Sequence, residues 1–423
     1  MSSSVASQTS EPLRILIVTQ YFWPENFQIN HLARALQARG HQITVLTDKP
    51  NYPTGRFFPG YSMLGRNSDD YNGIAVIRAP LIRRGNGARA RLALNYLSFA
   101  MGGMLVAWLR LKPSFDCIFV YEPSPITVGL PALAARQKTG AAILFWVQDL
   151  WPESVVAAGG VRASALLYAL RRMVTFIYRR CARILIQSRA FRSQVVEAGA
   201  DDRKVIYWPQ SVDALFRPVA PAADAPPMFS TSDFRIVFGG NIGHAQDFET
   251  VLDAAELLRH ADVHWIIVGD GRRREWLAAQ IERRGLNERM QLTGPFPEEA
   301  MPGLFAHADA LLVTLRDEPI FALTIPTKVQ AYMACGKPLI AMLNGEGARL
   351  VSEAQAGLVA PAGNAAALAA AISRLAAMAP GERAIFGENG LAYSNRNFDR
   401  DTLVDQLVGL MREVAAERQG QAG

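Results

Sequence analysis

Cysteine is scarce in this chain of 423 residues. Its three cysteines, Cys117, Cys181 and Cys335, lie far apart and form no Cys-x-x-Cys pair. A zinc site needs clustered ligands, and a disulfide framework needs a denser and even set, so the sequence argues against both. We therefore expect a protein of a reducing compartment.

Long apolar segments are also few. Residues 1–12 are polar and hold no apolar stretch of signal-peptide length, so we expect a disordered tail there. One uncharged stretch, 92–109, has 18 residues and is just long enough to be a membrane-span candidate. Polar and small residues within it, such as Asn95 and Gly102, weaken that reading. We expect a helix that packs partly on its domain and lies partly in a bilayer interface, with a true span as the alternative.

Acidic residues are missing from a long part of the first half. From Tyr71 to Phe115 the chain has none, but it has seven Lys and Arg. The first 210 residues carry 25 Lys and Arg against 12 Asp and Glu, whereas the remainder carries 19 against 26. This asymmetry predicts that the first half meets an anionic partner. No nucleic-acid-binding module is visible, so we expect an anionic membrane surface and no nucleic acid.

A second basic segment, 161–204, has ten Lys and Arg against three Asp and Glu. Its helical part, 165–180, interleaves apolar residues with pairs of arginines, as a helix that binds membrane surfaces does. The alternative is a solvated basic face on a core helix.

The chain is long enough for two domains. Short apolar runs of strand length alternate with helical patterns, which predicts an α/β fold with parallel sheets. We expect one domain at 13–215, a Pro- and Ala-rich linker at 216–232, a second domain at 233–395 and a C-terminal helix at 396–418. The first half lacks G-x-G-x-x-G, so a dinucleotide site is not expected there.

Polar residues follow the predicted strands of the first domain, at the ends where such sheets bind ligands. Asp149 and Glu153 come within five residues of each other after the run 142–147. The alternatives are a helix cap for Asp149 and a plain turn for 51–55. The polar candidates for contacting a ligand are Glu25, Asn26, Asn51, Tyr52, Gln148, Asp149 and Glu153.

Glycines follow the strands of the second domain. Gly240 and Gly243 come after one strand, and Gly269 and Gly271 after the next. Without a Cβ, such a turn lets the backbone approach a phosphate closely. Alone, this is a weak signal.

Residues 320–345 predict a tight loop, a short helix and a buried strand. Pro326 suits the start of the helix, because its missing N–H is one that a first turn leaves unpaired. Gly336 stops the helix. The helix start offers free N–H groups and a positive dipole end, and Lys328 adds a charge, so we expect phosphate binding. An ordinary αβ unit with a surface lysine is the alternative.

Two motifs resemble family 4 of the retaining glycosyltransferases, which have the GT-B fold. Pro-Thr-Lys-Val-Gln-Ala-Tyr-Met-Ala-Cys-Gly-Lys-Pro at 326–338 is similar to the donor-site segment of WbuB/WcaI-like enzymes of bacterial polysaccharide assembly. Gln-Asp-Leu-Trp-Pro-Glu-Ser at 148–154 is similar to the same subfamily. The resemblance covers about residues 13–415. It implies an α/β fold of two Rossmann-like domains facing a cleft, with a C-terminal helix crossing back to the first domain.

The resemblance also implies roles for individual residues. Lys328 and Asp149 are the expected catalytic residues: Lys328 holds the departing diphosphate, and Asp149 positions or polarises sugar hydroxyls. The expected donor-binding residues are Gly240, Asn241, Gly243, Gly269, Asp270, Gly271, Phe296, Leu323, Thr324, Ile325, Thr327 and Lys328. The resemblance implies that the ligand of the polar candidates in the first domain is an acceptor substrate.

The chain departs from the family at several of its positions, among them the stretch of His244, Gln246 and Asp247, where a Lys is usual. Ala331 and Leu323 stand where most members have glutamates, Gln148 where many have His, and Asn241 where Arg is usual. The donor ribose contact must therefore come from elsewhere. The diphosphate charge then rests more on Lys328, on backbone N–H groups and on Arg316.

The implied reaction moves a sugar from a nucleotide sugar, UDP-sugar rather than GDP-sugar, with retention at the anomeric carbon. The implied acceptor is a polyprenyl-diphosphate-linked saccharide of exopolysaccharide, O-antigen or capsule assembly. We expect no metal and no cofactor besides this co-substrate, because we find no DxD or His cluster placed to ligate a metal. We expect a cytoplasmic protein bound peripherally to the inner face of the plasma membrane.

Two other classes of protein stay open. One is a UDP-sugar 2-epimerase on the same architecture, which would need no membrane face. The other is a non-catalytic nucleotide-sugar-binding protein, which the departures at Gln148, Asn241 and Ala331 would suit.

Overall fold

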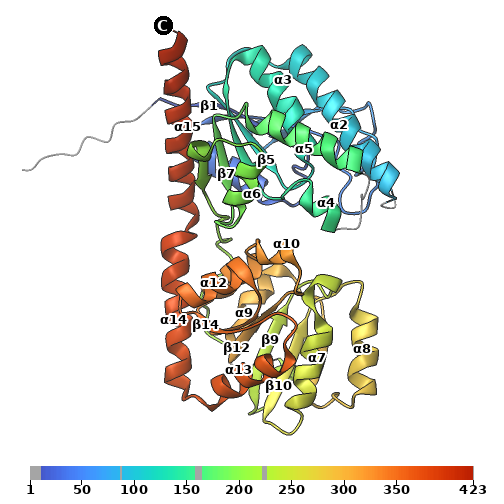
Figure 1. The fold of residues 1–423 in the computed structure, drawn as a ribbon, viewed down its shortest axis with the longest axis vertical. Helices are drawn as coiled ribbons and strands as arrows, with labels where there is room; N and C mark the ends of the chain where they lie inside the picture. The colour runs from blue at the N-terminus through green and yellow to red at the C-terminus, as the bar shows by residue number, and fades with distance from the viewer. Residues whose placement is uncertain (1–10, 86–87, 158–163, 222–225, 423) are drawn as a thin grey trace, which may run out of the picture. The chain divides into compact units, whose positions relative to one another are not determined.

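The computed structural model describes residues 11–85, 88–157, 164–221 and 226–422, and the chain divides into two compact units (Figure 1). Unit 1 comprises Met1–Gln187, Phe191–Trp208 and Val404–Gly423; unit 2 comprises Ser188–Ala190 and Pro209–Leu403. The predicted tail lies outside the described residues except for its last two.

Unit 1 is built on an eight-stranded sheet in the order β3-β4-β2-β1-β5-β6-β7-β8. All neighbouring strands are parallel except β3, which pairs antiparallel with β4. The strands are β1 (Arg14–Thr19), β2 (Gln42–Thr47), β3 (Ser68–Tyr71), β4 (Ile74–Arg78), β5 (Cys117–Glu122), β6 (Ala142–Val147), β7 (Arg183–Ile186) and β8 (Val205–Tyr207). Nearly continuous apolar runs form the central strands, because both faces are covered.

The helices of unit 1 connect these strands. They are α1 (Gln28–Ala38), α2 (Arg89–Arg110), α3 (Gly129–Thr139), α4 (Glu153–Ala157), α5 (Ser164–Tyr178) and α6 (Phe191–Glu197). Helix α3 packs on β5 and β6, and both α2 and α5 pack on α3.

Unit 2 has a six-stranded parallel sheet in the order β11-β10-β9-β12-β13-β14. The strands are β9 (Phe234–Gly239), β10 (Val263–Val268), β11 (Met290–Gly294), β12 (Ala310–Thr314), β13 (Leu339–Met342) and β14 (Gly357–Ala360). Counted along the unit, this is the order 3-2-1-4-5-6 of a dinucleotide-binding Rossmann sheet. The strand order reverses between β9 and β12, and such sheets bind ligands at this switch point.

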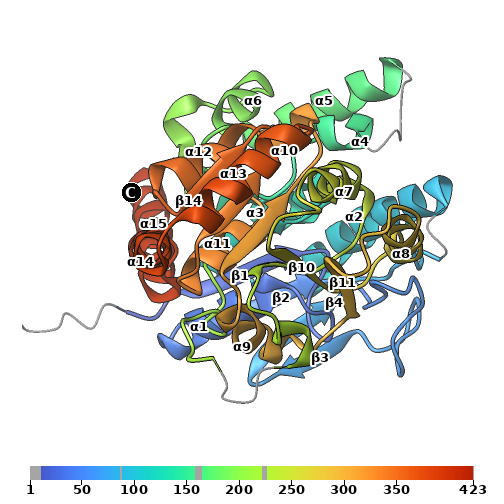
Figure 2. The ribbon, with the colours of Figure 1, turned by 90° about the horizontal axis from the view of Figure 1, so that it is seen from below.

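Helices cover both faces of the unit 2 sheet (Figures 1 and 2). One core cluster joins the sheet to α7 (Phe248–Leu257), α8 (Arg274–Arg283) and α13 (Ala365–Ala377). The other joins it to α9 (Met301–Ala306), α11 (Thr327–Ala334) and α12 (Gly345–Glu353). The remaining helices are α10 (Pro319–Ala322), α14 (Pro380–Asn397) and α15 (Arg400–Ala422).

The predicted α/β fold of two Rossmann-like units is confirmed, with differences at its connections. The C-terminal helix is broken: α14 ends at Asn397, buried Phe398 follows, and α15 starts at Arg400. Residues from Val404 on belong to unit 1, where Glu417 pairs with Arg183. Within the predicted linker, Met228 and Phe229 are packed in the core of unit 2, while 222–225 lie outside the described residues.

Candidate active site

The turns after β9 and β10 lie against each other at the switch point of the unit 2 sheet. The N–H of Gly240 donates to the carbonyl of Val268, and the N–H of Ile242 donates to that of Asp270. A Cβ at Gly269 would overlap the carbonyl oxygen of Gly240, and Gly269 has a φ of +143°. Only glycine therefore fits there, and it leaves a surface of bare backbone.

Lys328 lies directly on this backbone surface. A Cβ built on Gly240 would be 2.8 Å from its Cε and 3.0 Å from its Nζ. The Nζ also lies 3.7 Å from the centroid of the Phe238 ring. Burial lowers the pKa of Lys328 to about 7. Burial is the only cause of this pKa shift, and no carboxylate of the described residues compensates the charge of the ammonium. A desolvated cation beside open backbone suits an anionic ligand.

Helix α11 brings Lys328 to this turn. Its N-cap is Pro326, one residue before the helix starts, whereas the sequence placed Pro326 inside the first turn. No side chain caps this N-terminus in the described structure, so its first amides stay open to a ligand. The hydroxyl of Tyr332, on the same helix, accepts from the N–H of Gly239 at 2.9 Å and donates to its carbonyl at 3.1 Å. The helix and the end of β9 are thus fixed to each other.

The other predicted donor residues differ in accessibility. Asn241, Asp270, Phe296 and Thr327 are exposed at the ends of strands or helices, while Leu323 and Thr324 are half-buried. Gly243 and Gly271 adjoin the side chain of Asn241. Ile325 is buried in the core of unit 2, so its side chain is not available to a ligand.

Arg316 was expected to share the diphosphate charge, but it has an acidic partner. Its Nη2 lies 2.9 Å from Oε2 of Glu249, and its Nε donates to the carbonyl of His244 at 2.7 Å. Glu249 also pairs with Arg273. Lys328, by contrast, has no acidic partner among the described residues.

In unit 1, Asp149 follows the end of β6. Burial raises its pKa to about 6, and polar groups of Ser154 and Trp151 beside it partly offset this rise. Glu122, at the end of neighbouring β5, is fully buried, and burial and the charge of Asp149 raise its pKa well above the usual range. Half-buried Gln148 precedes Asp149, and Glu153 begins α4. Asp149 is thus the ionised member of a desolvated carboxyl pair near neutral pH.

Glu25 and Asn51, two predicted acceptor-binding residues, are buried within their loops. Oε1 of Glu25 accepts from the backbone N–H of Asn51 at 2.8 Å and of Tyr52 at 2.7 Å. Oδ1 of Asn51 accepts from the N–H of Arg84 at 3.1 Å. Their side chains hold loops together, whereas Asn26 and Tyr52 are exposed.

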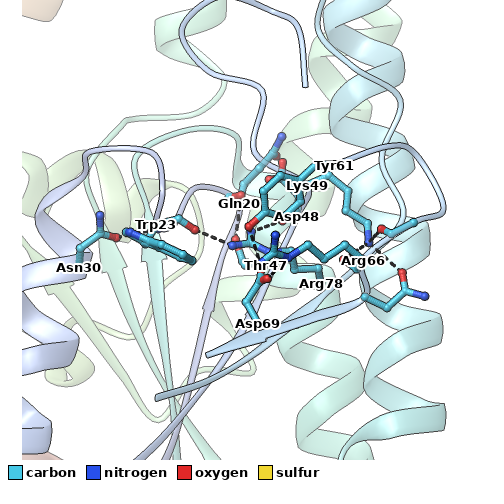
Figure 3. Close-up of polar contacts among 12 residues, drawn as sticks. Gln20, Trp23, Asn30, Thr47, Asp48, Lys49, Tyr61, Arg66, Asp69 and Arg78 are labelled. Carbon is cyan, nitrogen blue, oxygen red and sulfur yellow. Dashed lines mark hydrogen bonds and ion pairs between the residues drawn. The ribbon is translucent and has the colours of Figure 1, made fainter. Parts of the chain in front are cut away.

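A buried ion network behind these loops was not predicted from the sequence (Figure 3). Arg78, at the end of β4, pairs with Asp69 and donates to the carbonyls of Asp48 at 2.8 Å and Trp23 at 2.6 Å. Lys49 donates to the carbonyl of Arg66 at 2.7 Å. The network joins the loops after β1 and β2 to the edge of the sheet.

The described residues hold no group of three or more His, Cys, Asp or Glu side chains that could ligate a metal ion. Among the described residues, Lys328 and the amides at the start of α11 are groups that can meet an anionic ligand at the glycine turns.

Comparison with known proteins identifies both halves of the chain. A family model described as "Glycosyl transferase 4-like domain" matches residues 26–210, and one described as "Glycosyl transferases group 1" matches 233–378. WbjE of Pseudomonas aeruginosa, named as a glycosyltransferase, is 28% identical over 60% of this chain and 64% of its own length, a little under two thirds. WcaI of Escherichia coli, named for colanic acid biosynthesis, is 28% identical over 71% of this chain and 75% of its own.

Among solved structures, HepE of Anabaena in complex with UDP has the same fold. Its TM-score is 0.68 at 16% sequence identity, over 95% of this chain and 100% of that one. The two family models follow one another along the sequence and match the two Rossmann-like units. The chain belongs to the family 4 glycosyltransferases of GT-B fold.

Proposed function

We propose that the protein transfers a sugar from a UDP-sugar to a lipid-linked saccharide, with retention of the anomeric configuration, in assembly of a bacterial exopolysaccharide, O-antigen or capsule. The observation that carries this proposal is Lys328, a desolvated ammonium without a carboxylate partner in the described residues, placed on the glycine turn after β9. The presence of UDP in the HepE complex supports UDP as the nucleotide of the donor. The name of WcaI, which refers to colanic acid biosynthesis, supports polysaccharide assembly as the process.

The chemistry follows from where negative charge develops. As the glycosidic bond to the diphosphate breaks, charge accumulates on the leaving phosphate. The amides at the start of α11 and the Nζ of Lys328 are in place before the reaction, so little reorganisation is needed to stabilise that charge. The proposed reaction uses no metal, because these groups supply the compensating positive charge.

In this proposal Asp149 binds the acceptor. With a pKa of about 6, it is mostly ionised at neutral pH and can accept a hydrogen bond from a sugar hydroxyl. Glu122 behind it is held neutral by burial and by the charge of Asp149.

The direct test is incubation of the protein with a panel of nucleotide sugars and a polyprenyl-diphosphate-linked acceptor. We expect release of UDP from one donor, at a rate that rises when acceptor is present. Epimerised UDP-sugar without transfer would favour a 2-epimerase. Binding of UDP without release from any donor would favour a non-catalytic protein.

We propose an anionic membrane surface as the second partner, with α2 as the contact. By length and composition α2 could cross a membrane, but one face of it is built into unit 1. Oδ1 of Asn95 accepts from Gln20 at 2.9 Å, and its Nδ2 donates to the carbonyl of Ile82 at 2.7 Å. A Cβ at Gly103 would lie 2.7 Å from Pro131. Because α2 is held in unit 1 in this way, we propose that it lies in the membrane interface and does not cross the bilayer.

The opposite face of α2 is apolar and exposed. Met101 is 69% exposed and Leu105 is 57% exposed, and Leu94, Leu97, Trp108 and Leu109 are exposed with them. Arginines stand at both ends of the helix, Arg89 and Arg91 at the start and Arg110 at the end. An apolar stripe between cationic ends fits a bilayer that contains anionic lipid.

The double variant Met101→Glu/Leu105→Glu should bind vesicles with about 30 mol% anionic lipid at least about tenfold more weakly, because two charges enter the apolar stripe. Co-sedimentation measures this. Leu257→Glu is the matched control, because Leu257 is 63% exposed on α7 of unit 2. Equal binding of the double variant and the wild type would remove α2 from the membrane contact.

A further inference from the structure

Arg84 is a half-buried cation at the ligand-binding edge of unit 1 that the sequence did not single out. It follows β4, and its guanidinium Nη1 donates to the hydroxyl of Tyr21 at 2.7 Å. No carboxylate of the described residues lies within 4.0 Å of it, whereas Arg78 nearby pairs with Asp69. The other guanidinium donors of Arg84 are thus open to a ligand that brings its own negative charge.

The backbone around Arg84 is fixed before any ligand arrives. Its N–H donates to Oδ1 of Asn51, whose own loop is held by Glu25. On the other side, the N–H of Ile82 donates to Oγ of Ser98 at 3.0 Å. A fixed backbone lowers the entropy cost of binding, so Arg84 is preorganised.

An aromatic platform lies beneath the guanidinium. Its Cζ is 5.8 Å from the ring centroid of Tyr21 and 5.2 Å from that of Tyr52. Tyr21 stacks on Phe27 with centroids 4.9 Å apart and rings 10° from parallel. Tyr52 contacts both rings and is 40% exposed. The guanidinium is therefore held over two rings and still open at one side.

We propose that Arg84, with Tyr21 and Tyr52, forms a subsite for the phosphoryl group of the acceptor, a prenyl-linked sugar diphosphate. Arg84 binds the phosphoryl oxygens through its open N–H donors, since a guanidinium matches phosphate in geometry and charge. The exposed face of Tyr52 receives the adjoining apolar surface of the acceptor. The inference rests on the proposed function and adds the recognition element for its acceptor.

The test is calorimetric titration of the full chain, saturated with UDP so that the donor site is filled, with geranyl diphosphate. Arg84→Gln should weaken binding at least about tenfold, because it removes a charge-assisted bidentate contact. Arg84→Lys should recover part of the lost affinity, because lysine restores the positive charge but not the planar, bidentate donor geometry of the guanidinium. Arg83→Gln is the matched control, since Arg83 is the exposed neighbour. It should bind like the wild type.

The outcomes separate this subsite from its rivals. Titration with sn-glycerol 3-phosphate represents a phospholipid headgroup, and equal affinity for both probes would overturn the acceptor assignment. Wild-type affinity in Arg84→Gln, or no binding of geranyl diphosphate to the wild type, would overturn the subsite. A urea transition of unit 1 like that of the wild type shows that unit 1 of Arg84→Gln is folded, because UDP reports only on unit 2. Failure of the wild type to bind UDP would instead contradict the proposed function.

Discussion

The Lys328→Met variant is expected to lose about two to three orders of magnitude in kcat, the loss seen when one preorganised group is removed from a developing negative charge. The side chain has no carboxylate partner in the described structure, so its charge is not already neutralised. The rate of UDP release measures the effect. Arg259→Met is the control, because it removes a charge from an exposed site of the same unit. Unchanged kinetics would place the diphosphate elsewhere.

The pH dependence of UDP affinity gives a second readout of Lys328. Its pKa is about 7 in the free protein, and a bound diphosphate favours the ammonium form. The free protein loses this proton as pH rises above 7, so the UDP affinity should fall about tenfold per pH unit between pH 7 and 9. Lys328→Met should show no such slope in calorimetry over the same range. A flat wild-type profile would contradict the role.

The Arg78→Met variant is expected to lower the stability of unit 1 by about 3–5 kcal/mol, the cost of removing one partner from a buried ionic network. The change leaves two buried carbonyls, of Asp48 and Trp23, without their donor. Urea unfolding of the full chain measures it. Addition of UDP identifies the transition of unit 2, because a ligand raises the stability of the unit that binds it.

An exposed arginine supplies the control for Arg78. Arg203 pairs with Asp201 at 2.8 Å, but its side chain is 88% exposed. Arg203→Met should leave the urea midpoint unchanged, because water screens such pairs. If Arg78→Met also left the midpoint unchanged, the network in Figure 3 would not stabilise unit 1.

Periodic features of the fold could be predicted from sequence. The predicted run 142–147 matches β6 residue for residue, because a strand buried on both faces leaves a continuous apolar signal. The glycine turns and Lys328 could be singled out because backbone approach and charge depend on local residue types. The break at Phe398 could not, since it depends on packing into the core of unit 2.

The acceptor side was harder to predict. Glu25 and Asn51 looked like ligand contacts, because nothing local shows that the carboxylate of Glu25 binds the amides of another loop. Arg84 was missed because its partners, Tyr21 and Tyr52, come from two distant loops. The one available signal was an arginine in a stretch without acids, which is consistent with a cation kept for a ligand.

The division of unit 1 along the chain has a consequence for its biosynthesis. Its sheet is made first, but its last segment, from Val404 on, is made after the whole of unit 2. In that segment Arg418 donates to the carbonyls of Phe115 at 3.1 Å and Thr139 at 3.0 Å. All strands of unit 2 are made before those bonds can form, so the last segment of unit 1 packs onto its sheet only after them. The sheet synthesised earliest waits longest for its final helix.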